Sequence, residues 1–172
     1  MNKWKDAEPL EIMTLRLDGH VFAIEATHVR EILDLGTVTE VPSASPFVNG
    51  LINVRGKVVP LADLRIKFGM EQKDATVDTR IVVIEIDIDG IPSIVGIRAD
   101  KVHEVTELLP AALEETPKLG MKWQPDFIRC IGKRGTDFIV VPNIERIFSQ
   151  TTAAVAEASA DRNSVPAAPA HA

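Results

Sequence analysis

The pattern of apolar and polar residues is most regular in the middle of the chain. Two apolar runs, residues 51–54 and 58–61, flank the polar tripeptide Arg55-Gly56-Lys57. Gly56 tolerates the positive φ of a tight turn, so the pattern predicts a β-hairpin with Arg55 and Lys57 at its tip. Such a tip either presents side chains to a partner or is an ordinary solvated turn, and both interpretations stay open at this point.

The residues after this hairpin predict a strand end, a short helix and a linker. Pro60 lacks an N–H, so the second strand should end there or run along the edge of a sheet. Asp63 should cap a short helix that extends through Phe68. Residues 69–79 are polar and without periodicity, which is typical of a linker.

Two similar hairpins are predicted elsewhere. Residues 11–17 alternate in polarity, and Asp18-Gly19 turns the chain into the apolar residues 21–24. Residues 80–97 repeat this arrangement around Asp89-Gly90. Asp-Gly pairs between apolar runs are a strong hairpin signal, so each half of the chain should contain one such hairpin.

A change of period follows the first of these hairpins. From Ala26 onward, apolar residues recur at Val29, Ile32 and Leu33, a spacing that favours a short helix ended by Gly36. Two prolines then stiffen the loop at residues 42–46.

The second half of the chain matches the first at further places in the same order. The matching pairs are Val102-His103-Glu104-Val105 with Val29-Arg30-Glu31-Ile32, residues 127–131 with 47–51, and residues 141–144 with 59–62. The separation drifts from 71 residues (Gly19 to Gly90) to 82 (Pro60 to Pro142), as insertions in loops would produce. The order of the matches indicates two copies of one small β unit, and many short strands favour sandwiches or small barrels.

Composition narrows the class of protein. With 172 residues, 45% of them hydrophobic, the chain can bury one core or two small ones. A net charge of −6 lacks the basic surplus that nucleic-acid binding usually needs. No apolar run approaches the ~20 residues of a membrane span, and residues 1–10 have no signal-peptide core, so we expect a cytoplasmic protein.

The single cysteine and the C-terminal residues carry little chemistry. Cys130 has no partner for an internal disulfide, which fits a reducing compartment, and its strand-like surroundings predict a buried, inert thiol. Alanine, polar residues and two prolines dominate from Ser149 onward, so the tail is expected to be disordered.

Patterns for catalysis and metal binding are weak. The four histidines form no pair with ligand spacing; they are His20, His28, His103 and His171. Residues 85–90 imitate the start of a calcium loop, but position twelve is Gly96 instead of Glu, and an alternating strand explains them better. No enzyme activity, metal or cofactor is therefore predicted.

A resemblance adds to this interpretation. The segment N-V-R-G-K-V-V-P-L-A-D-L-R, residues 53–65, resembles the N-L-R-G-x-x-V-P-x-x-D-L-R motif of CheW, the coupling protein of bacterial chemotaxis. Further similar segments are V-R-E-I-L, I-V-V-I, V-G-I-R-A-D-K-V and P-N-I-E-R-I-F, so the resemblance extends from the opening strand to residue 148, nearly all of the chain that is expected to be ordered. Val54 replaces the usual leucine of the motif, and the second half matches less closely.

The resemblance implies a mainly β fold of two small five-stranded SH3-like barrels with short helices and a groove between the barrels. The expected division is an N-terminal extension (1–10), a CheW-like domain (11–148) and a disordered tail (149–172). Within the domain, the barrel units should span about 11–68 and 80–148, joined by a linker at 69–79, and the termini can be exchanged between the barrels.

The resemblance also implies a non-enzymatic adaptor. Its partners would be the cytoplasmic tip of chemoreceptors and the regulatory domain of the histidine kinase CheA, with no nucleic acid and no direct insertion into the membrane. The protein would be recruited from the cytoplasm to membrane-associated receptor arrays. The alternative is a CheW-like scaffold of a non-flagellar chemosensory pathway that controls gene regulation or surface motility.

Candidate contact residues follow from these patterns. Arg55 is expected to contact a partner or to reach back to Glu31 on the adjacent helix, and we favour the second. The full receptor hypothesis comprises Val29, Glu31, Ile32, Gly50, Arg55, Val102 and Val105. The kinase hypothesis comprises Val38, Val41, Pro42 and Phe47, in a loop that its prolines hold in place. For the apolar members of both sets, simple burial in the core is the alternative.

Overall fold

β-Strands are the main secondary structure of the described residues, and the helical segments are short. The computed structural model describes residues 3–4, 6–117 and 124–149. The strands are β1 (Leu10–Leu17), β2 (His20–Glu25), β3 (Val29–Asp34), β4 (Thr39–Glu40), β5 (Gly50–Val54), β6 (Lys57–Ala62), β7 (Arg80–Ile88), β8 (Ile91–Ala99), β9 (Lys101–Leu108), β10 (Leu113–Glu114), β11 (Ile128–Arg134) and β12 (Asp137–Pro142). The helical segments are η1 (Ala26–His28), η2 (Pro46–Val48), α1 (Leu64–Lys67), η3 (Pro110–Ala112), η4 (Pro125–Phe127) and residues 144–149.

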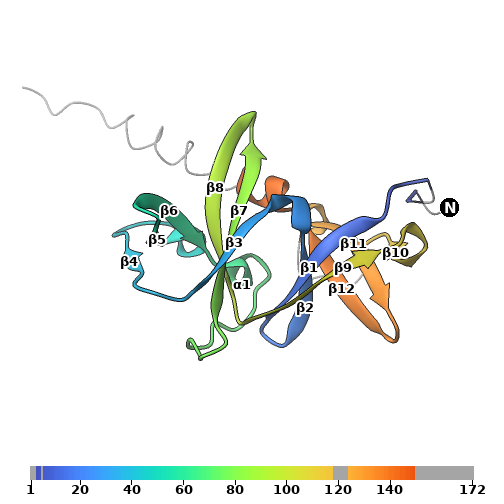
Figure 1. Cartoon of the computed structure of the whole chain (residues 1–172), viewed down its shortest axis with the longest axis horizontal. Helices are drawn as coiled ribbons and strands as arrows, with labels where there is room; N and C mark the ends of the chain where they lie inside the picture. The colour runs from blue at the N-terminus through green and yellow to red at the C-terminus, as the bar shows by residue number, and fades with distance from the viewer. Residues whose placement is uncertain (1–2, 5, 118–123, 150–172) are drawn as a thin grey trace, which may run out of the picture.

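The strands form two curled sheets that lie side by side along the long axis of the molecule (Figure 1). Sheet A has the order β10-β11-β12-β2-β1-β9, and sheet B has the order β4-β5-β6-β8-β7-β3. Each sheet has six strands, one of them only two residues long. The predicted class, a mainly β chain with two small barrel-like units, is confirmed.

The two sheets have the same topology, strand for strand. Each is antiparallel except for one parallel pair, β12 with β2 in sheet A and β6 with β8 in sheet B. Each has a register shift in its outer ladder, between Met13 and Leu15 in sheet A and between Val29 and Glu31 in sheet B. The chain therefore contains two copies of one unit.

The sheets do not divide the chain at the linker. Sheet A combines β1 and β2 with β9 to β12, whereas sheet B contains β3 to β8. The chain crosses between the sheets at Ala26–His28 and again at Asp100, the single residue between β8 and β9. Sheet A is thus assembled from two segments that are distant in sequence, whereas one continuous stretch forms sheet B, and local patterns do not reveal this division.

The prediction of a helix after Ala26 is wrong. Only Ala26–His28 form a 3₁₀ turn, and the following residues are strand β3, paired with β7. Val29 packs against the core between the sheets, Leu33 against the interior of sheet B, and Ile32 is exposed. Because these three side chains do not share one face, their helical spacing is coincidental.

Three apolar clusters hold the fold together. One contains residues of both sheets, such as Leu15 of β1 and Ile84 of β7, and fills the space between them. A second lies inside sheet A and includes Cys130, which is buried as predicted. A third lies inside sheet B and includes Ile52. The large shared cluster makes the two units one packed body.

The central hairpin matches its prediction at the turn and differs at the proline. Arg55 and Gly56 both have positive φ, +52° and +83°, and the Asp63 carboxylate accepts a hydrogen bond from Arg65 N as a helix cap. Strand β6, however, continues past Pro60 to Ala62 between β5 and β8. Its ladder with β8 begins only at Leu61, so the missing N–H removes no bond on that side.

The termini are described only in part. Leu10 already belongs to β1, and Trp4 of the N-terminal extension packs against the cluster inside sheet A. Ser149 is helical, and the remainder of the tail expected to be disordered lies outside the described residues.

Candidate functional site

An acid–arginine pair bridges the open side of sheet B. Arg55 Nη2 donates to Glu31 Oε2 at 3.0 Å, from the tip of the β5–β6 hairpin to the edge strand β3. The two strands are not neighbours in the sheet, because β3 and β5 lie near opposite edges. The Arg55 side chain is 83% exposed, whereas Glu31 is half-buried. The predicted contact is present, although Glu31 comes from a strand instead of a helix.

A cleft of about 470 Å³ surrounds this pair. Its floor is apolar, with Val54, Val59 and Val83, and its rim is charged. Arg30 forms a further ion pair there with Glu85 of β7. The complete lining is Arg30, Glu31, Val54, Arg55, Lys57, Val59, Val83, Glu85 and Ile94. We call this surface cleft B.

Sheet A carries a second cleft at the equivalent place. It measures about 640 Å³ and is lined by His103, Glu104, Arg134, Gly135, Asp137, Ile139, Thr14, Arg16 and Val21. The strand registers show that these nine residues occupy positions equivalent to Arg30, Glu31, Val54, Arg55, Lys57, Val59, Val83, Glu85 and Ile94, in that order. We call it cleft A.

The central ion pair is also repeated. Arg134 pairs with Glu104, which occupies the position of Glu31, although Arg134 stands one residue before the equivalent of Arg55. Other charges differ, because Asp137 replaces Lys57 and Arg16 replaces Glu85. Arg16 Nε donates to His103 Nε2 at 3.1 Å where cleft B has an ion pair. The clefts therefore share their position in the repeated unit and differ in volume and charge.

The four apolar receptor candidates divide into two kinds. Ile32 and Val105 occupy equivalent positions and are 45% and 57% exposed. Val29 and Val102 are also equivalent, but they are half-buried against the cluster between the sheets. A partner can contact the first pair directly, whereas the second pair belongs largely to the core.

Gly50 lies at a tightly packed point at the start of β5. It is buried, and a Cβ added to it would lie 2.6 Å from Val38 Cγ1. Real Cβ atoms do not approach that closely, so only glycine lets the start of β5 pack beneath Val38. The sequence hypothesis placed this residue at the receptor surface, where the structure does not place it.

The kinase candidates are only partly at the surface. Phe47 is 1% exposed and its ring packs 5.3 Å from that of Phe148, so the idea that it is an exposed anchor is wrong. Val38 is half-buried against the interior of sheet B. Val41 and Pro42 are exposed, and Val41 N donates to Asn49 O at 2.8 Å, which holds the loop in place.

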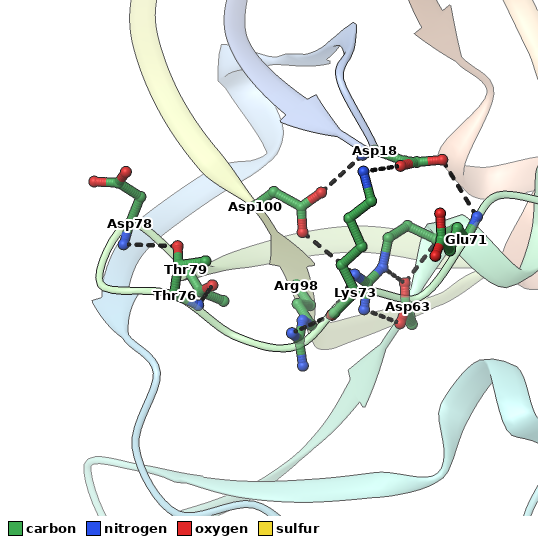
Figure 2. A network of polar contacts seen from close by, with 10 residues as sticks. Asp18, Asp63, Glu71, Lys73, Thr76, Asp78, Thr79, Arg98 and Asp100 are labelled. Carbon is green, nitrogen blue, oxygen red and sulfur yellow. Dashed lines mark hydrogen bonds and ion pairs between the residues drawn. The ribbon is translucent and has the colours of Figure 1, made fainter.

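Sequence patterns missed two features of the site. The Arg134–Glu104 pair was hidden because its arginine is displaced by one residue from the repeat. A polar network around the buried Arg65 joins residues that are far apart in sequence, among them Asp18 and Asp100 (Figure 2). The Asp63-x-Arg65 spacing after a strand was its only local signal.

The acidic residues of strand β7 do not converge on one point. Glu85 pairs with Arg30, and Asp87 accepts a hydrogen bond from Gly90 N at 2.7 Å to close the hairpin turn. Within residues 3–4, 6–117 and 124–149, no group of three His, Cys, Asp or Glu side chains could hold a metal ion. These carboxylates stabilise the strand and its turn.

The fold and the clefts define a class of protein. It is a duplicated β domain that displays charged and apolar side chains over extended surfaces. The chain belongs to the family of the CheW-like domain, whose model matches residues 11–152. This family consists of scaffold and adaptor proteins and not of enzymes.

Individual relatives agree with this assignment. The chain is 26% identical over 147 residues to the chemotaxis protein CheW of Klebsiella aerogenes, covering 86% of each chain. It is similar to the crystal structure of the scaffolding protein TtCheW from Thermoanaerobacter tengcongensis, with a TM-score of 0.72 and 27% identity. The match covers 82% of this chain and 88% of the TtCheW chain. It is also 28% identical over 99 residues to Protein PilI of Pseudomonas aeruginosa, which covers 55% of this chain and 56% of PilI.

The helical segments of the described residues are short. In the part of the chain that the structure describes, no helix combines the length and the apolar surface needed to cross a membrane.

Proposed function

We propose that this chain couples chemoreceptors to a CheA-type histidine kinase as a non-enzymatic adaptor. Membership of the CheW-like family and the similarity to proteins named for chemotaxis support this proposal. The observation that carries it is the Arg55–Glu31 ion pair at cleft B. Glu31 of this pair and the exposed Ile32 are neighbours on β3, the edge strand of sheet B. The protein would then act at membrane-associated receptor arrays.

The receptor contact is assigned to the edge strands β3 and β9. Ile32 and Val105 offer exposed apolar side chains beside charged ones, an arrangement that suits the amphipathic helices of a receptor tip. Val29 and Val102 support these strands from the core. Arg55 and Glu31 hold the adjoining surface in shape, and Gly50 permits the underlying packing.

The kinase contact is assigned to a separate surface. The loop with Val41 and Pro42 is exposed at the β4–β5 end of sheet B, away from the β3 edge in the strand order. Because the loop is held by a backbone hydrogen bond and two prolines, little ordering is required when it binds. The regulatory domain of the kinase would bind here, and separate surfaces would let one molecule bridge kinase and receptor.

A reconstitution with purified components tests the proposal. The chain is titrated with a receptor cytoplasmic fragment, with the regulatory domain of the kinase, and with both together. The expected result is that each partner binds alone and that neither displaces the other. Binding of neither partner would contradict the adaptor function, and mutual displacement would contradict separate surfaces.

A second candidate is a scaffold in a chemosensory pathway that controls gene regulation or surface motility. The similarity to Protein PilI, whose name does not refer to chemotaxis, favours it. The fold and the contacts would be the same and only the partners would differ. A pull-down from the native cell followed by mass spectrometry distinguishes the two, because it identifies which receptor and which kinase are recovered with the chain.

A further inference from the structure

Arg65 is a charged side chain in the interior. It is 2% exposed, and the Asp63 carboxylate binds it through two hydrogen bonds, Nε to Oδ1 at 2.9 Å and Nη2 to Oδ2 at 2.8 Å. The remaining nitrogen, Nη1, donates to Lys73 O at 3.0 Å and to Asp100 Oδ1 at 3.4 Å. A buried guanidinium requires such a set of acceptors, so the segments that provide them are fixed relative to α1.

The network continues from sheet B into sheet A. Asp100 is the residue at which the chain crosses between the sheets, and its Oδ2 accepts a hydrogen bond from Asp18 N at 2.7 Å. Asp100 N donates to Arg16 O at 3.0 Å. Asp18 lies in the β1–β2 turn of sheet A, so a continuous chain of hydrogen bonds connects α1 with that turn (Figure 2).

The linker at residues 69–79 is fastened to the same network. The Asp18 carboxylate accepts from Glu71 N at 3.3 Å and pairs with Lys73 Nζ at 3.1 Å. The Lys73 ammonium lowers the pKa of Asp18, and Asp18 raises the pKa of Lys73, which agrees with a direct contact. The linker therefore works as a strap across both sheets and not as a free connection. We call Asp18, Asp63, Arg65, Lys73 and Asp100 the brace.

The brace exists at only one of the two equivalent junctions. The strand registers place Asn143 at the position of Asp63, Glu145 at that of Arg65, and Thr27 at that of Asp100. These residues are unable to form the same network, because the arginine is replaced by an acid. The brace is thus a feature of one junction and is not repeated at the other.

We propose that the brace fixes the orientation of sheet A relative to sheet B, and that its members are positioning residues for any partner that contacts both sheets. The apolar cluster between the sheets holds them together but is non-directional, whereas the brace imposes direction through charged hydrogen bonds. Under the proposed function, it sets the separation between Ile32 on β3 and Val105 on β9 and so shapes the receptor surface.

The first experiment measures the separation of the sheets without any partner. Spin labels are attached to Val58→Cys in sheet B and Phe138→Cys in sheet A, two exposed positions, while the buried Cys130 stays unlabelled. Asp18→Gly removes the carboxylate and tolerates the positive φ of the turn. A distance distribution broader than that of the parent supports the brace, and an unchanged one overturns it.

A matched control lies in the equivalent turn of sheet B. Asp89 has φ +52° before Gly90, as Asp18 has φ +47° before Gly19, and the structure records no polar side-chain contact for Asp89 among the described residues. Asp89→Gly should leave the distance distribution unchanged. An equal broadening with both variants would show that turn flexibility and not the brace is responsible, which overturns the proposal.

A second pair of variants tests the centre of the network. Asp100→Asn keeps the shape of the side chain and removes its charge, and Asp74→Asn makes the same change at an exposed linker position beside Lys73. The first should broaden the distribution and weaken receptor-fragment binding, and the second should do neither. A broadened distribution with unchanged receptor binding would keep the brace and contradict the receptor assignment, so the two ideas fail separately.

Discussion

Arg55 and Glu31 are joined across the open side of sheet B, with 3.0 Å between Nη2 and Oε2. Arg134 and Glu104 form the same kind of pair across sheet A. In both sheets the glutamate lies on an outer strand, β3 or β9, and the arginine at a hairpin tip. In each curled sheet, an ion pair therefore joins two strands that are not hydrogen-bonded neighbours.

The first prediction is that Arg55 and Glu31 affect receptor binding through their shared ion pair and not independently. Arg55→Ala and Glu31→Ala should each weaken receptor-fragment binding, on the order of tenfold or about 1.4 kcal/mol, and the double variant should be no weaker than either. Because the arginine is largely exposed, unfolding stability should fall by no more than about 1 kcal/mol. Titration calorimetry and thermal unfolding measure the two effects. Additive losses of binding would show that Arg55 and Glu31 act independently.

The second prediction concerns the close packing at Gly50. Gly50→Ala places a Cβ 2.6 Å from the stiff, β-branched Val38, and should destabilise the fold by about 1–3 kcal/mol. Gly36→Ala, where no atom lies within 4 Å, is the control and should change little. Val38→Ala combined with Gly50→Ala should recover part of the loss. Urea unfolding measures all three, and an equal effect at both glycines would argue against steric packing.

The third prediction separates core from surface on β3. Val29→Glu introduces a charge beside the cluster between the sheets and should destabilise the protein by several kcal/mol, on the order of 3 kcal/mol. Ile32→Glu, at an exposed position, should change unfolding stability by about 0.5 kcal/mol or less and still abolish receptor binding. Unchanged receptor binding by folded Ile32→Glu would remove β3 from the receptor surface.

The fourth prediction concerns the cysteine. Cys130 is fully buried, and this burial raises the pKa of its thiol above the usual value of 9.0. The thiol therefore stays protonated to a higher pH in the folded state than in the unfolded state. The contribution of the protonated thiol to stability is present below pH 9.0 and is lost as pH rises through the folded pKa. Thiol reagents should react at pH 8 only in denaturant. Rapid labelling of the native protein would show that sheet A opens.

The sequence predicted what local chemistry determines. The Arg55-Gly56 turn and the Asp63 cap were foreseen because each depends on a few adjacent residues. Strand β3 was mistaken for a helix because Val29, Ile32 and Leu33 are buried by different parts of the fold, which no local period encodes.

Long-range contacts account for the other differences between prediction and structure. Asp18 and Asp100 are 82 residues apart and meet only because the chain crosses from sheet B into sheet A at Asp100. Phe47 lies in a proline-rich loop whose composition indicates exposure, but its ring is covered by Phe148 from the C-terminal helix. Both relationships depend on how the two units interlock, and not on residues nearby in sequence.

The fifth prediction tests whether kinase and receptor use different surfaces. Val41 is exposed in the loop before β5, so Val41→Asp should strongly reduce binding of the kinase regulatory domain and leave unfolding stability nearly unchanged. Binding of the receptor fragment should persist, because β3 and β9 are untouched. Phe47→Ala is a contrasting variant: removal of a buried ring should destabilise the fold by about 3–5 kcal/mol, so its effect on kinase binding would reflect unfolding and not contact. Both affinities are measured on the same purified protein. Equal loss of kinase and receptor binding by a stably folded Val41→Asp would show that the two partners share one surface.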